Sequence, residues 1–313
     1  MTPLVTVVIP TYNSAKFIRD ALESILSQTY PNIEIIVMDG ASKDGTADIA
    51  RAVAPNAIVI SEPDRGQTHA INKGWAMAKG DIVTWLCADD GYYPETVADA
   101  VVALESNSGT RWVYGLADHL DENGIPSPMR HPVMPWNYSK LRDWGNYIIQ
   151  PSTFLRKDVV DQKGMPDESL HYVMDYEYWL RIGNDIPGYF APEIRVWVKN
   201  YRETKSRSGR TRRLIEIREM IRSHGGADIP SQMRWEWTAA YISEFVRHIR
   251  AWEFWHLGAD AREIIHYPLT LPRALFKMMI GLVPPSTETR LRRLFVRRHD
   301  YLVGIPEHDR AAP

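Results

Sequence analysis

Short apolar runs rich in β-branched residues alternate with amphipathic segments over the first 105 residues of the chain. The apolar runs cover residues 6–9, 34–38, 57–60 and 81–86. Strands that are covered on both faces of a sheet have this nearly continuous apolar character. After the first run, apolar residues recur at helical spacing, at Phe17, Ile18, Ala21, Leu22, Ile25 and Leu26. The alternation predicts an α/β fold with a Rossmann-like, mainly parallel sheet, right-handed crossovers and flanking helices.

The pattern changes twice further along the chain. Residues 112–116 have strand character, residues 121–124 have turn chemistry, and a helix is predicted to begin near Met174. Beyond about residue 205 the pattern becomes helical and rich in arginine. We therefore expect an α/β region over residues 1–204 and a helical C-terminal region over residues 205–313.

Carboxylates follow three of the first four predicted strands. Asp39 follows the second strand, Asp64 the third, and Asp89 with Asp90 the fourth. In open α/β sheets the ligand binds beyond the carboxyl ends of the strands, so these residues are candidates for a binding site. Because Asp, Asn and Gly also favour turns, each of them taken alone is as well explained by local turn formation.

Asp89 and Asp90 are the best candidates for a metal site. Hard divalent cations prefer carboxylate oxygens, and Mg²⁺ is typically held by one or two carboxylates together with substrate phosphates. We expect Gly91 to let the backbone turn away close to a ligand. The alternative is that the pair caps a helix that begins near Pro94. Thr46 is similarly expected to cap the helix that follows it.

Several other classes of protein are disfavoured. The chain has neither a GxxxxGKS phosphate loop nor a GxGxxG after the first strand, which disfavours P-loop enzymes and dehydrogenases. Its single cysteine, Cys87, predicts a reducing compartment and no internal disulfide. No apolar run is long enough to span a membrane, and the first residues predict no signal peptide.

The ordered motifs of the first 90 residues resemble a known family. They are VIPTYN at 8–13, VMDGASKDGT at 37–46, DRG at 64–66, AINKG at 70–74, AKGD at 78–81 and WLCADD at 85–90. Together they resemble the inverting family-2 glycosyltransferases of GT-A fold, over roughly residues 4–200. The resemblance implies a nucleotide-sugar-binding catalytic domain over residues 1–204, with a donor half at 1–117 and an acceptor half at 118–204.

The resemblance also implies roles for individual residues. Asp89, with help from Asp90, would hold Mn²⁺ or Mg²⁺ as the last acid of the family's Asp-x-Asp motif. Cys87 stands at the first position of that motif, and a soft thiol is a poor ligand for these cations. The nucleotide would lie among Pro10, Thr11, Tyr12, Asn13, Asp39, Asp64, Arg65, Asn72 and Lys73.

An inverting transfer needs a general base, and the resemblance implies Asp175. The segment from Met174 to Ile182 is similar to the family's helix that bears this acid. The alternative for Asp175 is a helix N-cap. Glu177 stands four residues before Arg181, which favours a structural ion pair. On the acceptor side the resemblance implies Gln150, Ser152 and Thr153, and His171 could donate a hydrogen bond to Asp175.

The net charge differs in sign between the first 200 residues and the rest of the chain. Residues 1–200 hold 17 basic and 26 acidic residues, a net charge of −9, whereas residues 201–313 hold 20 and 13, a net charge of +7. Apolar segments near residues 267–284 are bracketed by arginines at 207–213 and 290–298, which favours an anionic membrane surface. Packing on the catalytic region or on a second subunit would explain the same pattern. Nucleic-acid binding lacks any supporting motif.

The expected protein is a metal-dependent inverting hexosyltransferase with a nucleoside-diphosphate sugar donor, UDP-linked by preference. Its acceptor would be a hydroxyl of a glycan or of a lipid-linked molecule, in polysaccharide or glycoconjugate synthesis. We expect a cytoplasmic location, peripheral on the inner face of the membrane, with homo-oligomerisation open. The alternative is a catalytically silent nucleotide-sugar-binding scaffold.

Overall fold

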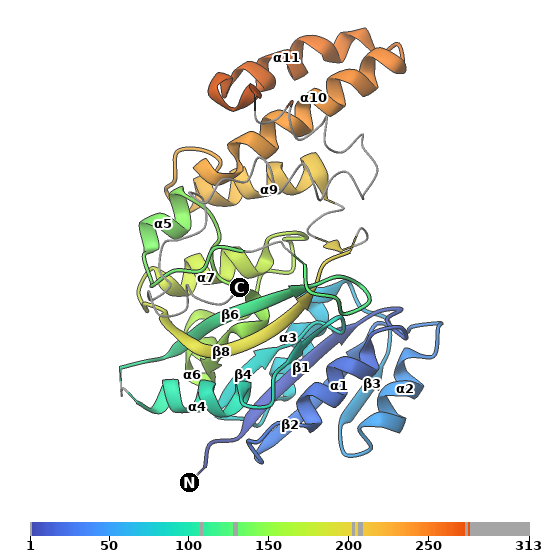
Figure 1. Cartoon of the computed structure of the whole chain (residues 1–313), viewed down its shortest axis with the longest axis vertical. Coiled ribbons are helices and arrows are strands. Elements are labelled where there is room, and N and C mark those ends of the chain that lie inside the picture. The colour runs from blue at the N-terminus through green and yellow to red at the C-terminus, as the bar shows by residue number, and fades with distance from the viewer. Residues whose placement is uncertain are drawn as a thin grey trace. The chain divides into compact units, whose positions relative to one another are not determined.

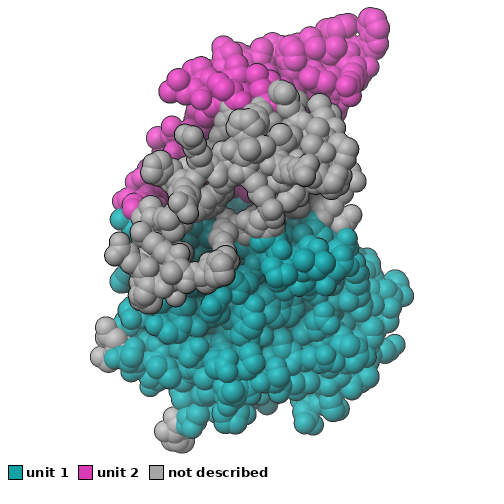
Figure 2. All heavy atoms as spheres, viewed as in Figure 1, with its two compact units in different colours: residues 1–138, 147–204 teal, residues 139–146, 205–313 magenta. Residues whose placement is uncertain are grey.

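The computed structural model describes residues 2–106, 109–127, 131–201, 204–205, 209–272 and 275. The chain forms two compact units, which Figure 2 draws in different colours. Unit 1 comprises residues 1–138 and 147–204, and unit 2 comprises residues 139–146 and 205–313. The 139–146 segment, which lies within the expected acceptor half, therefore groups with unit 2. The division into a donor half and an acceptor half stays a prediction.

Unit 1 is built on one eight-stranded mixed sheet, with the order β3-β2-β1-β4-β7-β6-β8-β5. The pairs β1–β2, β1–β4, β2–β3 and β6–β8 are parallel, and the pairs that β7 and β5 make are antiparallel. In Figure 1, β1 and β2 are blue, and β6 and β8 are green and yellow. The strands are β1 Val5–Thr11, β2 Ile33–Asp39, β3 Ile58–Ser61, β4 Ile82–Trp85, β5 Asp90–Tyr92, β6 Trp112–Leu120, β7 Phe154–Arg156 and β8 Tyr189–Lys199.

The apolar runs of the sequence become the parallel strands β1 to β4, so the predicted fold class is confirmed. All seven residues of β1 and all four of β4 are buried, because these strands lie inside the sheet with both faces covered. Periodicity does not reveal β5 and β7, which have three residues each. Strand β8 mixes exposed, half-buried and buried positions instead of forming a continuous apolar run.

Helices flank this sheet, and four tryptophans from helices and strands pack against one another. The helices of unit 1 are α1 Ile18–Leu26, α2 Thr46–Val53, α3 Gln67–Met77, α4 Thr96–Glu105, α6 Lys157–Lys163 and α7 Met174–Gly183, with the 3₁₀ helix η1 Gln150–Ser152. Trp179 of α7 stacks on Trp85 and on Trp112, each at 5.5 Å between ring centroids. Trp75 of α3 meets Trp85 edge-on at 5.2 Å. These four tryptophans belong to the core.

Two local expectations are wrong. Thr46 does not cap α2, because it is the first helical residue and Gly45 occupies the N-cap position. Asp44 satisfies the helix instead, since its Oδ1 accepts a hydrogen bond from the Thr46 N–H at 3.1 Å. Gly91 does not free the backbone for a ligand: a Cβ there would lie 2.0 Å from the Trp197 ring, so β5 needs glycine to pack against β8.

Unit 2 is helical over the residues that the structure describes. It contains α9 Arg210–Ser223, α10 Arg234–Arg250 and α11 Leu257–Ile265, three short 3₁₀ helices, and most of α5 Tyr138–Asp143. The 3₁₀ helices are η2 Ser231–Met233, η3 Phe254–His256 and η4 Pro268–Thr270. Its buried side chains include Leu214, Ile217, Ile221 and Trp237. None of the described helices is both long enough and apolar enough to cross a bilayer.

Candidate active site

Backbone hydrogen bonds tie together the loops that follow β1, β2 and β3. The Gly40 N–H donates to the Thr11 carbonyl at 2.9 Å, and the Glu62 N–H donates to the Asp39 carbonyl at 2.9 Å. Asn13 binds the second loop twice, because its N–H donates to Ser42 Oγ at 2.7 Å and its Oδ1 accepts from the Lys43 N–H at 3.0 Å. Asn13 has a φ of 49°, a conformation that asparagine tolerates better than most residues. These loops therefore form one connected edge.

Gly40 brings two predicted nucleotide-binding residues together. A Cβ at this position would lie 2.7 Å from Asp64 Oδ2 and 3.3 Å from the ring of Tyr12. The two side chains come from the loops after β3 and β1, and each approaches the backbone of the loop after β2. Asp64 Oδ1 also accepts a hydrogen bond from the Gly66 N–H at 2.7 Å. Tyr12 remains 65% exposed, so a flat aromatic surface stands beside the Asp64 carboxylate.

Thr11 and Asp39 are the last residues of β1 and β2, directly before Tyr12 and Gly40. Asp39 is buried, and its carboxylate accepts hydrogen bonds from the Ser42 N–H, the Ser42 hydroxyl and the Ser61 hydroxyl. Asp39 therefore holds the second and third loops in register. Thr11 Oγ1 is buried and has no hydrogen-bond partner among the described residues. Pro10, which precedes it, is buried in β1.

The remaining predicted nucleotide ligands, just before α3 and in its middle, form ion pairs and hydrogen bonds. Arg65 binds Glu168 at 2.6 Å, and Asn72 donates to Glu168 Oε1 at 3.1 Å and to the Pro166 carbonyl at 3.0 Å. Lys73 is paired with Glu62. Because Arg65 and Asn72 share Glu168, the segment that leads into α7 is attached to the loop after β3.

The Asp89–Asp90 pair lies directly beyond β4. Possible ligand atoms of Cys87, Asp89 and Asp90 lie within 4.8 Å of one another. Asp90 begins β5, so the expectation that the pair caps a helix is wrong. Its Oδ1 accepts a hydrogen bond from the Lys199 N–H of β8 at 3.3 Å. Burial, and then the charge of Asp89, raise the pKa of the Asp90 carboxyl well above its usual range.

Tyr201 completes this cluster from a distant part of the sequence. Its hydroxyl donates to Asp89 Oδ2 at 2.8 Å, and its ring lies 5.1 Å from that of Phe17. Burial and the neighbouring Asp89 raise the pKa of the Tyr201 hydroxyl, which keeps it a hydrogen-bond donor. Sequence reasoning missed Tyr201 because 112 positions separate it from Asp89.

The donor set of this cluster fits Mg²⁺ or Mn²⁺. Two carboxylates supply hard oxygen ligands, and substrate phosphates normally complete the shell of such a cation. Cys87 has a different environment: the Gln67 side chain donates to its Sγ at 3.1 Å, and Gln150 Oε1 lies 3.8 Å away. A soft sulfur adds little to a site of this class. Asp89 and Asp90 are therefore the residues that would hold the cation.

Asp175 lies in the first turn of α7, which the tryptophan stack fixes to the sheet. The N-cap position belongs to Val173, so the alternative that Asp175 caps the helix is wrong. Trp179, one turn further on, stacks on Trp85 at the end of β4. The predicted pair of Glu177 with Arg181 is confirmed at 2.9 Å. Arg181 also donates to the carbonyls of residues 163 and 165, so this pair has a structural role.

The predicted acceptor-side residues differ in exposure. Gln150 is partly buried and donates to the Trp85 carbonyl at 2.7 Å. Ser152 and Thr153 are fully buried, and their hydroxyls donate to the carbonyls of Ile149 and Gln150. The contacts of these two hydroxyls thus hold η1 in the fold, and their acceptor-side role stays a prediction. His171 is exposed and meets Tyr172 edge-on at 4.5 Å; its bond to Asp175 is likewise a prediction.

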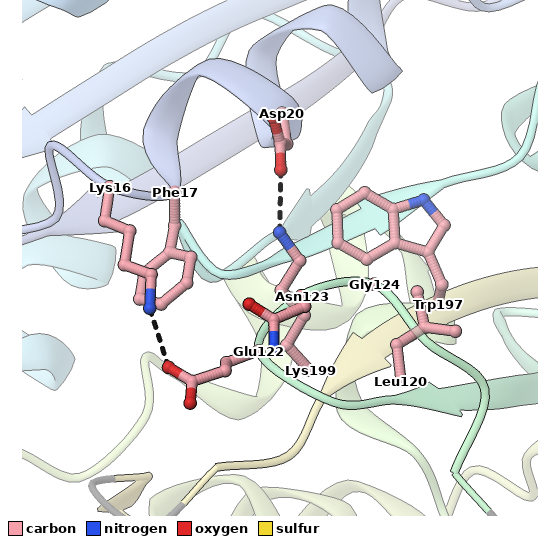
Figure 3. A pocket seen from close by; sticks show the side chains of 9 residues that line it. All are labelled: Lys16, Phe17, Asp20, Leu120, Glu122, Asn123, Gly124, Trp197 and Lys199. Carbon is pink, nitrogen blue, oxygen red and sulfur yellow. Dashed lines mark hydrogen bonds and ion pairs between the residues drawn. The ribbon is translucent and has the colours of Figure 1, made fainter.

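A separate pocket of about 270 Å³ lies between α1 and the end of β8 (Figure 3). Lys199 reaches into it, with its Nζ 2.7 Å from Asp20 and 5.2 Å from the rings of Phe17 and Trp197. Lys16 crosses its mouth to Glu122 at 2.7 Å. None of the predicted site residues lines this pocket. Lys199 nevertheless connects it to the Asp89–Asp90 cluster, because its backbone binds Asp90.

Comparison with solved structures shows the fold. A mannosyltransferase from Pyrobaculum calidifontis, solved with GDP-Man and Mn²⁺, has a TM-score of 0.60 at 19% identity over 95% of this chain and 88% of its own. S. aureus TarS with UDP-GlcNAc has a TM-score of 0.59 at 18% identity over 90% and 82%. At these identities the likeness concerns the fold alone.

Comparison of sequences shows the family. An uncharacterized glycosyltransferase of Rickettsia prowazekii is 32% identical over 202 residues, which is 62% of this chain and 63% of the relative. A PGL/p-HBAD biosynthesis glycosyltransferase of Mycobacterium tuberculosis is 35% identical over 118 residues, or 36% and 46%. The alignments thus span less than two thirds of either relative. The model of glycosyl transferase family 2 matches residues 6–173, more than half of the chain, and the protein therefore belongs to this family.

Proposed function

We propose that the protein is an inverting, metal-dependent glycosyltransferase. It moves a sugar from a nucleoside-diphosphate donor to a hydroxyl of a glycan or lipid-linked acceptor, in polysaccharide or glycoconjugate synthesis. The observation that carries this proposal is the arrangement around β4: Asp89 and Asp90 lie in the connection from β4 to β5, and the Trp85–Trp179 stack attaches the helix of Asp175 to β4. Family membership supports the reaction class.

The donor would lie across the connected loops. Asp64 and Tyr12 meet at Gly40, and the buried Thr11 hydroxyl lies at the end of β1, directly before Tyr12. Asp89 and Asp90 would hold Mn²⁺ or Mg²⁺, with Tyr201 orienting the Asp89 carboxylate through its hydrogen bond. When bound, the cation supplies positive charge that stabilises the leaving diphosphate. The side chains around it fix the position of the anomeric carbon.

Asp175 is proposed as the general base. It accepts the proton of the acceptor hydroxyl while the acceptor oxygen bonds to the anomeric carbon and the bond from that carbon to the diphosphate breaks. One displacement of this kind inverts the configuration. The proton ends on Asp175, and the electron pair leaves with the nucleoside diphosphate. The helix position of Asp175 is set by the core through Trp179, so the base is held by a rigid element.

The test of this assignment is Asp175→Asn in the full chain. A general base contributes roughly 10²–10⁴-fold to the rate, so transfer should fall by that factor while nucleotide affinity stays unchanged. Asp48→Asn is the matched control, because this aspartate lies on α2 with an 88% exposed side chain. Near-normal turnover of Asp175→Asn would exclude it as the base.

The nucleotide base of the sugar donor is proposed to be uracil. Solved structures of this fold contain different nucleotides, so an experiment has to decide the base. The mannosyltransferase was solved with GDP-Man, whereas TarS was solved with UDP or UDP-GlcNAc. Thermal unfolding should be measured with UDP, GDP, CMP and dTDP, each with and without Mn²⁺. Stabilisation by UDP only when Mn²⁺ is present supports both uracil as the nucleotide base and a donor site that depends on the metal. Equal stabilisation by GDP would overturn the preference for uracil.

The alternative is a nucleotide-sugar-binding scaffold without activity. The presence of both Asp89 and Asp175 favours an enzyme, because a scaffold needs no general base. Incubation with the donor that stabilises the protein separates the two. Release of free sugar and nucleoside diphosphate, lost in Asp175→Asn, supports the enzyme. Tight donor binding without any turnover, with or without candidate acceptors, would favour the scaffold.

We also propose that the protein works at an anionic membrane surface on the cytoplasmic side. Most of the segment first expected to lie on the membrane, at residues 273–274 and 276–284, falls outside the described residues, as do the arginines at 207 and 290–298. Support comes instead from the turn after α10, where Trp252, Phe254 and Trp255 are 75%, 53% and 76% exposed. Arg247 and Arg250 precede them in the sequence, at the end of α10. Exposed aromatics with flanking arginines suit the headgroup region.

Flotation with vesicles that contain anionic lipid tests this surface. Replacing Trp252 and Trp255 by serine together should reduce the bound fraction several-fold at physiological salt. Val102→Ser is the control, because this residue of α4 is 67% exposed in unit 1. Equal binding of all three proteins would exclude the aromatic turn as the membrane contact.

A further inference from the structure

The turn between α10 and α11 folds tightly back on the end of α10. The Glu253 N–H donates to the His248 carbonyl at 2.9 Å, and the His256 N–H donates to the Glu253 carbonyl at 3.2 Å. Trp252 adopts a φ of 59°, which reverses the chain direction. These bonds return the chain to His248 within eight residues. As a consequence, Glu253 and His256 lie beside a histidine that belongs to the helix.

Three possible metal ligands meet at this turn. Ligand atoms of His248, Glu253 and His256 lie within 4.8 Å of one another. Glu253 Oε2 is 3.6 Å from His248 Nε2, and the two imidazole rings are 4.6 Å apart at an angle of 23°. Zinc bonds of about 2.0–2.1 Å to nitrogen and oxygen place tetrahedral ligands roughly 3.3 Å apart. Small side-chain rotations, chiefly of the exposed His256, cover the difference.

His248 carries the second feature of a metal-binding histidine. Its Nδ1 lies 2.5 Å from Asp260 Oδ2, and both residues are buried, at 7% and 5% exposure. Since an aspartate oxygen accepts, Nδ1 carries the hydrogen and Nε2 presents its lone pair toward Glu253 and His256. Carboxylates fix metal-binding histidines in this way and raise their basicity. A buried carboxylate and a fixed tautomer thus support the ligand cluster independently of its distances.

Arg247 is the competing neighbour. Its guanidinium donates to His248 Nε2 at 2.5 Å and also binds Glu244 at 2.8 Å and Glu253 at 3.4 Å. A cation at Nε2 would displace the first of these bonds. The Arg247 side chain is 56% exposed, so it can turn to Glu244 and solvent without burying a charge. Without a metal, Arg247 and His248 would simply close the turn as an ion-pair network.

We propose that His248, Glu253 and His256 form a second metal site, for a divalent cation of the zinc class. Two imidazoles and one carboxylate suit Zn²⁺, whereas the two carboxylates of Asp89 and Asp90 suit Mg²⁺ or Mn²⁺. Three protein ligands leave a fourth position for water or a further ligand. The bound ion joins the end of α10 to η3 and so holds in place the turn that carries Trp252, Phe254 and Trp255.

The test uses the full chain, stripped with EDTA and desalted. Calorimetric titration with Zn²⁺ should give one tight site, and Co²⁺ should give visible d–d absorption bands of a nitrogen-rich site. His256→Ala should weaken Zn²⁺ binding by at least tenfold and remove the Co²⁺ bands. This variant should fold normally, because His256 is exposed. His266→Ala is the matched control: it is a 49% exposed histidine of the same unit that pairs with Asp228.

A second pair of variants separates this site from the proposed donor site. Asp260→Asn should weaken Zn²⁺ binding about 10–100-fold, as loss of a supporting carboxylate does elsewhere. Asp89→Asn should leave Zn²⁺ binding unchanged and affect only nucleotide binding that depends on Mn²⁺. Equal Zn²⁺ affinity in the unmodified chain, His256→Ala and His266→Ala would overturn the proposal. So would an absence of binding at tens of micromolar Zn²⁺, which would leave the ion-pair network as the function of the cluster.

Discussion

The loops beyond β4 and the turn after α10 both gather charged side chains, but the two regions are built differently. Around β4, Asp89 lies in the turn between β4 and β5, Asp90 begins β5 at the edge of the eight-stranded sheet, and stacked tryptophans hold the neighbouring helix. At the turn, His248, Glu253 and His256 are brought together by a few backbone bonds, and the aromatics beside them are exposed. The first region is supported by core packing, and the second by polar contacts. Their responses to mutation should therefore differ.

The largest difference should appear when a tryptophan is removed from each region. Trp179→Ala deletes a fully buried ring between Trp85 and Trp112, which should cost about 3–5 kcal/mol of unfolding free energy. Trp252→Ala removes a 75% exposed ring and should cost no more than about 0.5 kcal/mol. Urea denaturation of both variants measures this. Equal losses of unfolding free energy in the two variants would contradict the difference between a buried and an exposed ring.

Removing one ligand from each proposed metal site should give opposite results. Asp89→Asn should reduce Mn²⁺-dependent nucleotide affinity by about 100-fold, because a charged oxygen ligand is lost. His256→Ala should leave the Mn²⁺-dependent nucleotide affinity unchanged and should weaken Zn²⁺ binding. Calorimetry with each cation on each variant measures the four combinations. A variant that impairs both cations would show that the two sites are coupled or that the fold is damaged.

Two glycines provide a sharper test of packing. Gly91→Ala inserts a methyl group against the Trp197 ring and should cost about 1–3 kcal/mol, through overpacking between β5 and β8. Gly258→Ala lies in α11 with no atom within 4 Å of its new Cβ, and should stabilise the protein by up to about 1 kcal/mol. Thermal unfolding of the two variants should move in opposite directions. A stabilised Gly91→Ala would refute the close packing on Trp197.

The smallest effect is expected from Tyr201→Phe. This change removes the hydroxyl that donates to Asp89 and keeps the ring beside Phe17. A hydrogen bond to a charged group contributes about 1.5–3 kcal/mol, but the metal itself can replace part of it. We therefore expect a loss of Mn²⁺-dependent nucleotide affinity of about three- to tenfold, with Zn²⁺ binding unchanged. An unaffected nucleotide affinity would show that Tyr201 does not orient Asp89.

Much of the catalytic region was predictable from local rules. The runs at residues 6–9, 34–38, 57–60 and 81–86 became β1 to β4 because nearly continuous apolar strands suit a parallel sheet that helices cover on both faces. The candidate residues Asp39, Asp64 and Asp89 follow from the same rule, since ligands bind at the carboxyl ends of such strands. The pair of Glu177 with Arg181 followed from helix geometry.

Other features depend on contacts between distant residues. Tyr201 reaches Asp89 because β8 pairs with β5 and delivers the following residues to the strand end. Gly91 is required by Trp197, and Gly40 accommodates Asp64 and Tyr12. The N-cap position of α2 falls on Gly45 instead of Thr46, a shift of one residue that propensities do not resolve.

The sequence by itself determined the α/β class, the family resemblance and the strand ends that carry the candidate acids, because hydrophobic period and turn chemistry are local properties. Only the tertiary structure decided which distant groups join them. It placed Tyr201 on Asp89, buried Trp75, Trp85, Trp112 and Trp179 in the core, and left Trp252 and Trp255 exposed. These pairings depend on strand register, helix packing and chain reversal, which no short stretch of sequence encodes alone.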